Sequence, residues 1–171
     1  VWGESFQVEH IAVTNIKELC RLQKSKYVQS NLKNTYEETK KYLENGKIVL
    51  YSGTPCQIAG LYSFLGRDYE NLLTVDLVCH GIPSQKVLKA EISYLEAKNG
   101  KIADVSRNKK YQFYPSQYII NYTNGSELVI DEEGLEFRKA FISNLIQQKS
   151  CDECVYSTIP RVADISVADI F

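Results

Sequence analysis

The stretch from Tyr51 to Ala59 constrains the fold of this chain more than any other part of its sequence. It continues an apolar, β-branched run at 47–51 that is typical of a buried strand. Thr54 is a preferred N-cap residue, Pro55 suits the first helical position, and Gln57 completes a capping box with Thr54. The chain is therefore predicted to pass from a strand directly into a helix that begins at Pro55.

A second apolar run, at 72–78, follows this helix, which is predicted to span 55–65 and to end at Gly66. Strand, helix and strand in so short a stretch indicate a βαβ unit with parallel strands and a right-handed crossover. Because parallel strands end at the same edge of a sheet, Cys56 and Cys79 are predicted to lie close together. In open α/β sheets, ligands bind at that edge.

Further helices and strands are predicted along the rest of the chain. Helices are expected at 15–22, 35–45, 84–98 and 135–148, and strands at 1–13, 26–30, 101–107, 118–123, 127–131 and 164–169. Thr35 and Glu38 should form a capping box, and Asn124-Gly125 is a strong signal for a hairpin turn. Together these elements predict an α/β fold: a βαβ core with parallel strands plus an antiparallel hairpin extension, in a mixed sheet flanked by helices.

The composition is that of an ordinary globular domain. Of the 171 residues, 44% are hydrophobic and 24% are charged, so we expect a single domain over 1–171. A net charge of -1 gives no electrostatic case for nucleic acid or an anionic membrane as partner. No apolar run approaches the roughly 20 residues of a membrane span and no signal peptide is visible, so we expect a cytoplasmic protein. The lack of methionine suggests a piece of a longer gene product.

Five cysteines are more than packing needs, and their odd number and wide spacing do not suggest a disulfide framework. Cys20 is assigned to the core. Cys151 and Cys154 form a Cys-x-x-Cys pair, which chelates a metal or acts as a thiol redox couple. Together with Cys56 and Cys79 they supply four thiols, the number that an all-cysteine zinc site or an iron–sulfur cluster requires.

Four interpretations of these thiols stay open. One is a thiol oxidoreductase that uses Cys151 and Cys154, although these cysteines do not follow a strand at a helix start as that chemistry prefers. Structural zinc sites usually join two Cys-x-x-Cys-like knuckles on small folds that need the metal, so a zinc-stabilised interaction module fits less well than an electron-transfer cluster. Cys56 lies in the first turn of a helix, where free N–H groups and the helix dipole favour a thiolate. It could therefore serve a hydrolase or transferase, with His80 as base, although only Asp76 is available to orient that base.

Two glycine-containing loops precede helix starts at the same sheet edge. Gly53 lies in the first loop and Gly81 in the second, and such loops suit a phosphate or pyrophosphate group. The chain has neither a Gly-x-Gly-x-x-Gly nor a Walker sequence, so the alternative that both glycines only serve tight turns stays open.

Two long motifs carry a family resemblance. They are Gly-Thr-Pro-Cys-Gln-Ile-Ala-Gly-Leu at 53–61 and Val-Asp-Leu-Val-Cys-His-Gly-Ile-Pro-Ser at 75–84. With the pair Cys151 and Cys154 and the segment 164–169, they resemble the coenzyme F-420 hydrogenase/dehydrogenase beta-subunit family over nearly the whole chain. Members are iron–sulfur flavoproteins that pass electrons between ferredoxin-like clusters, FAD and, in methanogens, the deazaflavin coenzyme.

The resemblance implies cofactors, partners and site residues. Cys56, Cys79, Cys151 and Cys154 would hold a 4Fe–4S cluster beside FAD. The segment 25–30 also resembles a family segment. The implied flavin-binding residues come from three stretches of the chain: Tyr27, Gln29, Asn31, Ser52, Gly53, Thr54, Gln57, His80, Gly81 and Ser84. The implied partners are a ferredoxin-like domain or partner subunit and a small-molecule electron acceptor.

The sequence also departs from the family pattern. Many members begin with a cysteine-rich ferredoxin-like domain that this sequence lacks, and the closing Gly-Asp-Phe-Trp of relatives is replaced by Ala-Asp-Ile-Phe at 168–171. The segment after Arg107 diverges as well. The resemblance as a whole implies an oxidoreductase domain that transfers electrons between ferredoxin-type clusters, FAD and an acceptor. Because of these departures, the acceptor is left as a deazaflavin-like or other molecule.

Overall fold

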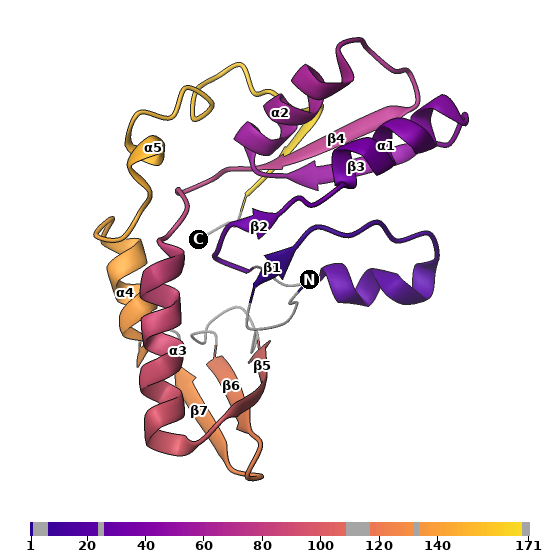
Figure 1. Cartoon of the computed structure of the whole chain (residues 1–171). Helices are drawn as coiled ribbons and strands as arrows, with labels where there is room; N and C mark the ends of the chain where they lie inside the picture. The colour runs from indigo at the N-terminus through magenta and orange to yellow at the C-terminus, as the bar shows by residue number, and fades with distance from the viewer. Residues whose placement is uncertain (2–6, 24–25, 109–116, 132–133, 169–171) are drawn as a thin grey trace. The chain divides into compact units, whose positions relative to one another are not determined.

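A computed structural model describes residues 1, 7–23, 26–108, 117–131 and 134–168 of the chain (Figure 1). The chain divides into two compact units. The parallel unit comprises Val1–Gln23, Ser30–Gly81 and Ser150–Phe171, and the antiparallel unit comprises Lys24–Gln29 and Ile82–Lys149. The predicted α/β class is confirmed, and the parallel and antiparallel strands lie in separate sheets.

A three-stranded parallel sheet forms the centre of the parallel unit. Its order is β3 (Val49–Gly53), β4 (Leu72–Leu77) and β8 (Ile165–Val167), with β4 in the middle. The predicted βαβ unit is confirmed, because α2 (Pro55–Leu65) connects the parallel strands β3 and β4. A second, two-stranded parallel sheet pairs β1 (Val8–Glu9) with β2 (Ser30–Asn31).

The start and end of α2 follow the sequence signals. Thr54 is the N-cap, and its backbone N–H donates to Gln57 Oε1 at 3.0 Å in the predicted capping box. Pro55 occupies the first turn, where the missing N–H costs nothing. Gly66 ends the helix with a left-handed φ of 69°, a conformation that glycine adopts without strain. The helix bounds predicted from sequence are therefore confirmed.

The core of the parallel unit lies between its helices and the sheet. Five buried side chains form it: Leu43, Tyr51, Ile58, Leu61 and Leu65. α1 (Thr35–Glu44) supplies the first of them, and β3 and α2 supply the others. The N-cap of α1 is Asn34, so the capping box predicted for Thr35 and Glu38 is wrong. Thr35 lies one position after the N-cap, and its hydroxyl donates to Leu32 O at 2.7 Å instead of capping the helix.

Gly60 allows α1 and α2 to approach each other, and Gly60→Ala is expected to destabilise the protein. A Cβ at this position would lie 2.8 Å from Tyr36 Oη, which donates to Gln57 O at 2.7 Å. Overpacking of this kind costs about 1–3 kcal/mol, against about 1 kcal/mol that alanine gains in helix propensity. Urea denaturation should show a net loss, part of which Tyr36→Phe restores by removing the oxygen. An unchanged midpoint would contradict the close contact.

The antiparallel unit joins a helix to a three-stranded sheet. After α3 (Gln85–Asn99), with its predicted N-cap Ser84, come β5 (Ile102–Asn108), β6 (Gln117–Tyr122) and β7 (Glu127–Asp131) in that order in the sheet. The Asn124-Gly125 turn joins β6 to β7 as predicted, and Gly125 has a φ of 84°. Buried residues of α3 and β6 form the core: Leu95, Ile120 and Tyr122.

Two predictions in the remaining helices are wrong. α4 spans Glu136–Ile142 and not 135–148, because the chain leaves the helical path at Asn144, where φ is 59°. Cys20 lies in the 3-10 helix η2 (Ile16–Leu22), and it is exposed and not part of the core. The short helix α5 (Lys149–Asp152) completes the described elements. None of the helices in the described ranges has the length and apolarity needed to cross a membrane.

Candidate functional site

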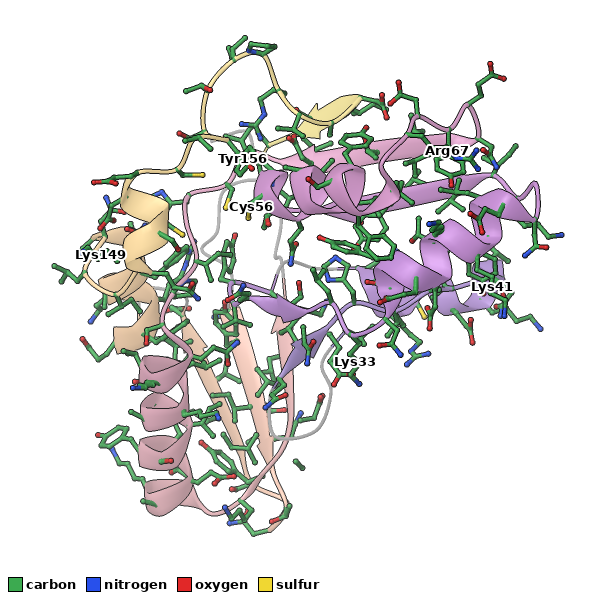
Figure 2. The ribbon with its side chains drawn as sticks, turned by 45° about the horizontal axis from the view of Figure 1, so that its top comes forward. Lys33, Lys41, Cys56, Arg67, Lys149 and Tyr156 are labelled. Carbon is green, nitrogen blue, oxygen red and sulfur yellow. The ribbon has the colours of Figure 1, made fainter. Side chains whose placement is uncertain are left out.

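Cys56 lies at the carboxyl edge of the parallel sheet. It follows β3 directly and occupies the first turn of α2, so the capping box that fixes the helix start also fixes this cysteine. Its side chain is exposed, and Thr54 Oγ1 lies 3.2 Å from its Sγ atom. Figure 2 shows Cys56 beside the segment that carries Tyr156.

Cys79 follows the neighbouring strand β4 and is half-buried. The backbone N–H of Gly81 donates to Cys79 Sγ at 3.4 Å. Burial raises the pKa of the Cys79 thiol, the Gly81 hydrogen bond opposes this effect, and charge interactions with Cys56, Cys151 and Cys154 raise the pKa further. Cys56 and Cys79 thus follow neighbouring parallel strands, whose carboxyl ends lie at the same edge of the sheet.

Cys151 and Cys154 reach the site from the C-terminal segment of the parallel unit. Cys151 lies in α5, and Cys154 is held in a turn in which Ser157 Oγ donates to Cys154 O at 2.8 Å. Both are half-buried. Among the residues that the structure describes, no three or more His, Cys, Asp or Glu side chains converge as around one bound metal ion. All five cysteines are free thiols.

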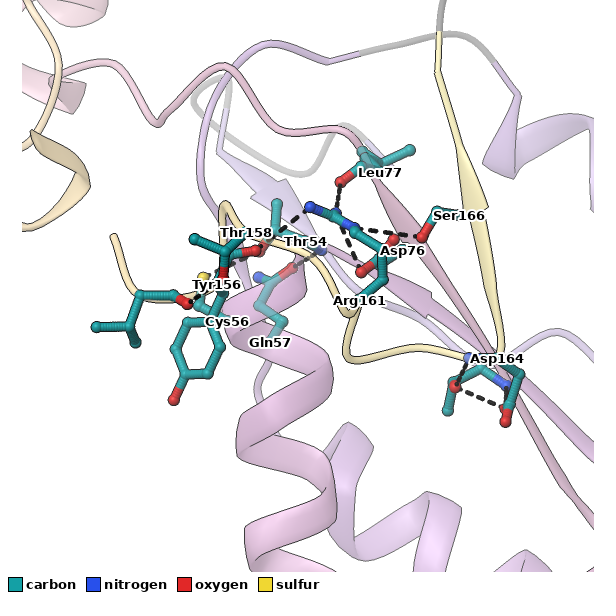
Figure 3. A network of polar contacts seen from close by, with 12 residues as sticks. Thr54, Cys56, Gln57, Asp76, Leu77, Tyr156, Thr158, Arg161, Asp164 and Ser166 are labelled. Carbon is teal, nitrogen blue, oxygen red and sulfur yellow. Dashed lines mark hydrogen bonds and ion pairs between the residues drawn. The ribbon is translucent and has the colours of Figure 1, made fainter. Parts of the chain in front are cut away.

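Arg161 was not anticipated from the sequence, yet it makes a dense set of contacts near these cysteines (Figure 3). Its Nη2 atom donates to Leu77 O at 2.8 Å and lies 3.1 Å from Asp76 Oδ2. Its Nη1 atom donates to Tyr156 O at 3.3 Å, and its Nε atom donates to Ser166 Oγ at 3.3 Å. The Asp76 side chain is fully buried, so Arg161 provides the counter-charge for a carboxylate inside the sheet.

A second contact fastens the same C-terminal segment to β4. Asp164 Oδ2 accepts hydrogen bonds from the backbone N–H and the hydroxyl of Thr74, at 2.8 and 2.7 Å. These bonds lower the pKa of Asp164. The Thr74 hydroxyl also lies 2.7 Å from Tyr62 Oη of α2. Two separate polar contacts, through Arg161 and Asp164, therefore hold this segment against the central strand.

The predicted flavin residues of the parallel unit differ in what their polar groups already bind. Gln57 is buried, and its amide both accepts from Thr54 N and donates to Ser30 Oγ at 3.0 Å. Asn31 Oδ1 accepts from Lys33 N at 3.0 Å. The remaining predicted residues lie at the carboxyl ends of β3 and β4: Ser52 and Gly53 end β3, Thr54 follows it, and His80 and Gly81 lie in the loop after β4. A Cβ at Gly53 would make a tight contact, 3.1 Å from Gln57 Oε1, so a larger residue here would require the Gln57 side chain to shift.

Three further predicted flavin residues belong to the antiparallel unit: Tyr27, Gln29 and Ser84. The Tyr27 ring stacks under the Arg138 guanidinium, whose Cζ atom lies 4.3 Å from the ring centroid. Gln29 Oε1 accepts from Gln148 Nε2 at 2.8 Å. Ser84 N donates to Ile146 O at 2.7 Å, and Ser84 caps α3. Tyr111, Phe113 and Tyr114, for which a packing role is expected, lie outside the described residues.

His10 supports the first loop from the N-terminal segment. Its ring stacks on Tyr51 with centroids 5.7 Å apart, and Nε2 lies 3.1 Å from Ser52 O. Because a carbonyl oxygen only accepts, Nε2 is the protonated nitrogen in this contact. The second ring nitrogen, Nδ1, is buried and has no hydrogen-bond partner among the described residues. His10 thus has a structural role, packing on Tyr51 and binding the backbone of Ser52.

The stability of the protein is expected to fall below about pH 6.5, in part through His10. Burial lowers the pKa of His10, against the raising effect of the bond to Ser52. The unfolded chain therefore gains the proton first, so the stability present above this pH is lost as the pH falls toward the folded pKa. Urea midpoints for His10→Gln between about pH 7 and 5 should depend less on pH than those of the wild type. Equal slopes would contradict this role.

Comparison with known proteins agrees with the sequence motifs. A search of curated proteins found no match. The family model for coenzyme F420 hydrogenase/dehydrogenase, specifically for the C terminus of the beta subunit, matches residues 46–171, a range that contains Cys56, Cys79, Cys151 and Cys154. Because this match covers most of the chain, the protein belongs to the coenzyme F420 hydrogenase/dehydrogenase beta-subunit family.

Proposed function

We propose that this chain is the cofactor-binding part of an iron–sulfur flavoprotein oxidoreductase, in which Cys56, Cys79, Cys151 and Cys154 hold a 4Fe–4S cluster. Family membership supports the broader statement that the chain has a hydrogenase/dehydrogenase beta-subunit-like redox function and works with a partner subunit. The observation that carries the finer proposal is topological: Cys56 and Cys79 follow the neighbouring parallel strands β3 and β4, and the C-terminal segment with Cys151 and Cys154 is bound to β4 through Arg161 and Asp164.

The donor set fits an iron–sulfur cluster. Four cysteine thiols match the usual ligand number, and the peptide N–H of Gly81 already points at Cys79 Sγ. Hydrogen bonds to ligating sulfur raise the reduction potential of such clusters, so this N–H would tune the site as well as orient the ligand. When bound, the cluster supplies one-electron transfer, and FAD couples it to two-electron chemistry.

FAD is proposed to bind at the loops after β3 and β4. Ser52, near the end of β3, and His80, after β4, are exposed, and Gly81 has a φ of 118°, which a side chain would disfavour. The first of these loops leads directly into α2, whose N-terminal N–H groups suit a phosphate. The proposed electron donor is a ferredoxin-like domain or subunit, and the proposed acceptor is a deazaflavin-like or other small molecule.

Cofactor analysis of the full-length protein, prepared without oxygen, tests this function. We expect about four iron and four sulfide per chain, released FAD, and a broad absorption near roughly 400 nm that dithionite bleaches. Colourless protein with one zinc per chain would contradict the proposal and favour the structural zinc module. Metal-free protein with a single hyper-reactive cysteine at position 56 would favour a hydrolase or transferase.

A further inference from the structure

We infer that Arg161 is a positioning residue that sets the spacing between Cys79 and Cys154 in the four-cysteine site. The inference rests on the proposed function, since it assigns this spacing a role in cofactor binding. Leu77 lies two positions before Cys79, and Tyr156 lies two positions after Cys154. The Arg161 guanidinium binds the backbone carbonyls of both, at 2.8 and 3.3 Å.

The chemistry of the guanidinium suits this task. Its N–H donors lie in one rigid plane, so two carbonyls bound to it are held at a fixed separation. Ser166 Oγ and Asp76 bind further positions of the same group and restrict its rotation. The Cys79 and Cys154 backbones, 75 positions apart in the sequence, are therefore linked through one side chain.

Attachment of the C-terminal segment does not by itself explain Arg161. Asp164 already fastens this segment to β4 through two hydrogen bonds from Thr74. Arg161 adds a contact that Asp164 does not make, namely the one to Tyr156 O beside the Cys-x-x-Cys pair. This additional contact controls the position of Cys154 relative to Cys79.

The ion pair with Asp76 points the same way. The nearest oxygen lies 3.1 Å from Arg161 Nη2, but neither Asp76 carboxylate oxygen makes a well-directed hydrogen bond among the described residues. A buried ion pair is often no more stabilising than apolar side chains of similar volume. Fold stability alone therefore gives little reason for a buried carboxylate at position 76 of β4, whereas orienting the Arg161 guanidinium toward two backbone carbonyls does give a reason.

The test compares Arg161→Gln, Arg161→Lys and the control Asp164→Asn in the full-length protein prepared without oxygen. Arg161→Gln should lower iron per chain at least twofold or shift the electron paramagnetic resonance spectrum of the reduced cluster. Arg161→Lys, which keeps the charge, should restore part of the change. Asp164→Asn should lower the thermal midpoint but leave the spectrum and the iron content unchanged. If Arg161→Gln only lowers the midpoint, as the control does, the inference is overturned.

A second measurement does not depend on the cluster. In metal-free, reduced protein, a short thiol crosslinker such as dibromobimane should bridge Cys79 and Cys154, and peptide mass spectrometry should show a severalfold lower yield in Arg161→Gln than in Asp164→Asn. An equal yield would overturn the inference. If the wild-type protein holds no cluster but the crosslinking yield is still lower in Arg161→Gln than in Asp164→Asn, the proposed function is contradicted and the spacing role of Arg161 is supported.

Discussion

Cys79→Ser is expected to remove most of the iron and sulfide from the protein, together with the absorption near roughly 400 nm. Cys79 follows β4 and is one of the four proposed ligands, so its loss leaves the proposed cluster with only three thiols. Cys154→Ser should act in the same way. Iron and sulfide analysis of anaerobically prepared variants measures the effect.

Cys20→Ser provides the matched control for these variants. Cys20 is an exposed thiol on η2, and its Sγ atom donates to Lys17 O within the same helix. This variant should keep the full iron content, since it removes a thiol without touching the site. Equal iron in Cys79→Ser and Cys20→Ser would show that the four-cysteine assignment is wrong.

Asp76→Ala is expected to lower the free energy of unfolding by about 3–5 kcal/mol. The Asp76 side chain is fully buried and that of Arg161 is 19% exposed, so removing the carboxylate leaves a largely desolvated cation without its counter-charge. Urea denaturation measures the loss. The exposed Glu70→Ala, in the loop before β4, should change the stability by less than about 0.5 kcal/mol.

A double variant separates the charge effect from packing. Asp76→Leu combined with Arg161→Met replaces the ion pair by apolar side chains, which is often neutral or stabilising. It should recover most of the stability that Asp76→Ala loses, yet it should not recover the cofactor properties affected by Arg161→Gln. A double variant as unstable as Asp76→Ala would show that the pair contributes more than mutual neutralisation.

The position of Cys56 could be predicted from sequence because local rules determine where α2 begins. Thr54, Pro55 and Gln57 fix the beginning of α2 through contacts within one helical turn. The proximity of Cys56 and Cys79 follows from a single topological rule, that neighbouring parallel strands end at the same edge. Neither inference needs knowledge of distant contacts.

Arg161 could not be found in this way, because its partners Asp76 and Leu77 lie 85 and 84 positions earlier in the chain. One signal was present: an aspartate within an apolar strand requires a partner once it is buried. The sequence does not say which cation supplies it. Similarly, apolar spacing continues past Ile142, but the positive φ at Asn144 ends α4, and spacing alone does not reveal such a break.

The order of chain segments in the parallel unit has a consequence for biosynthesis. Cys56 and Cys79 leave the ribosome well before Cys151 and Cys154, because the whole of Ile82–Lys149 is translated between them. β8, the last strand of the sheet in chain order, emerges later still. A nascent chain thus exposes two unmatched thiols for the time needed to synthesise this intervening stretch, at about 5–20 residues per second. If the four-cysteine assignment is correct, insertion of the proposed cluster would follow translation of residue 154, so the delivery machinery would meet a chain in which β3, α2 and β4 are already synthesised.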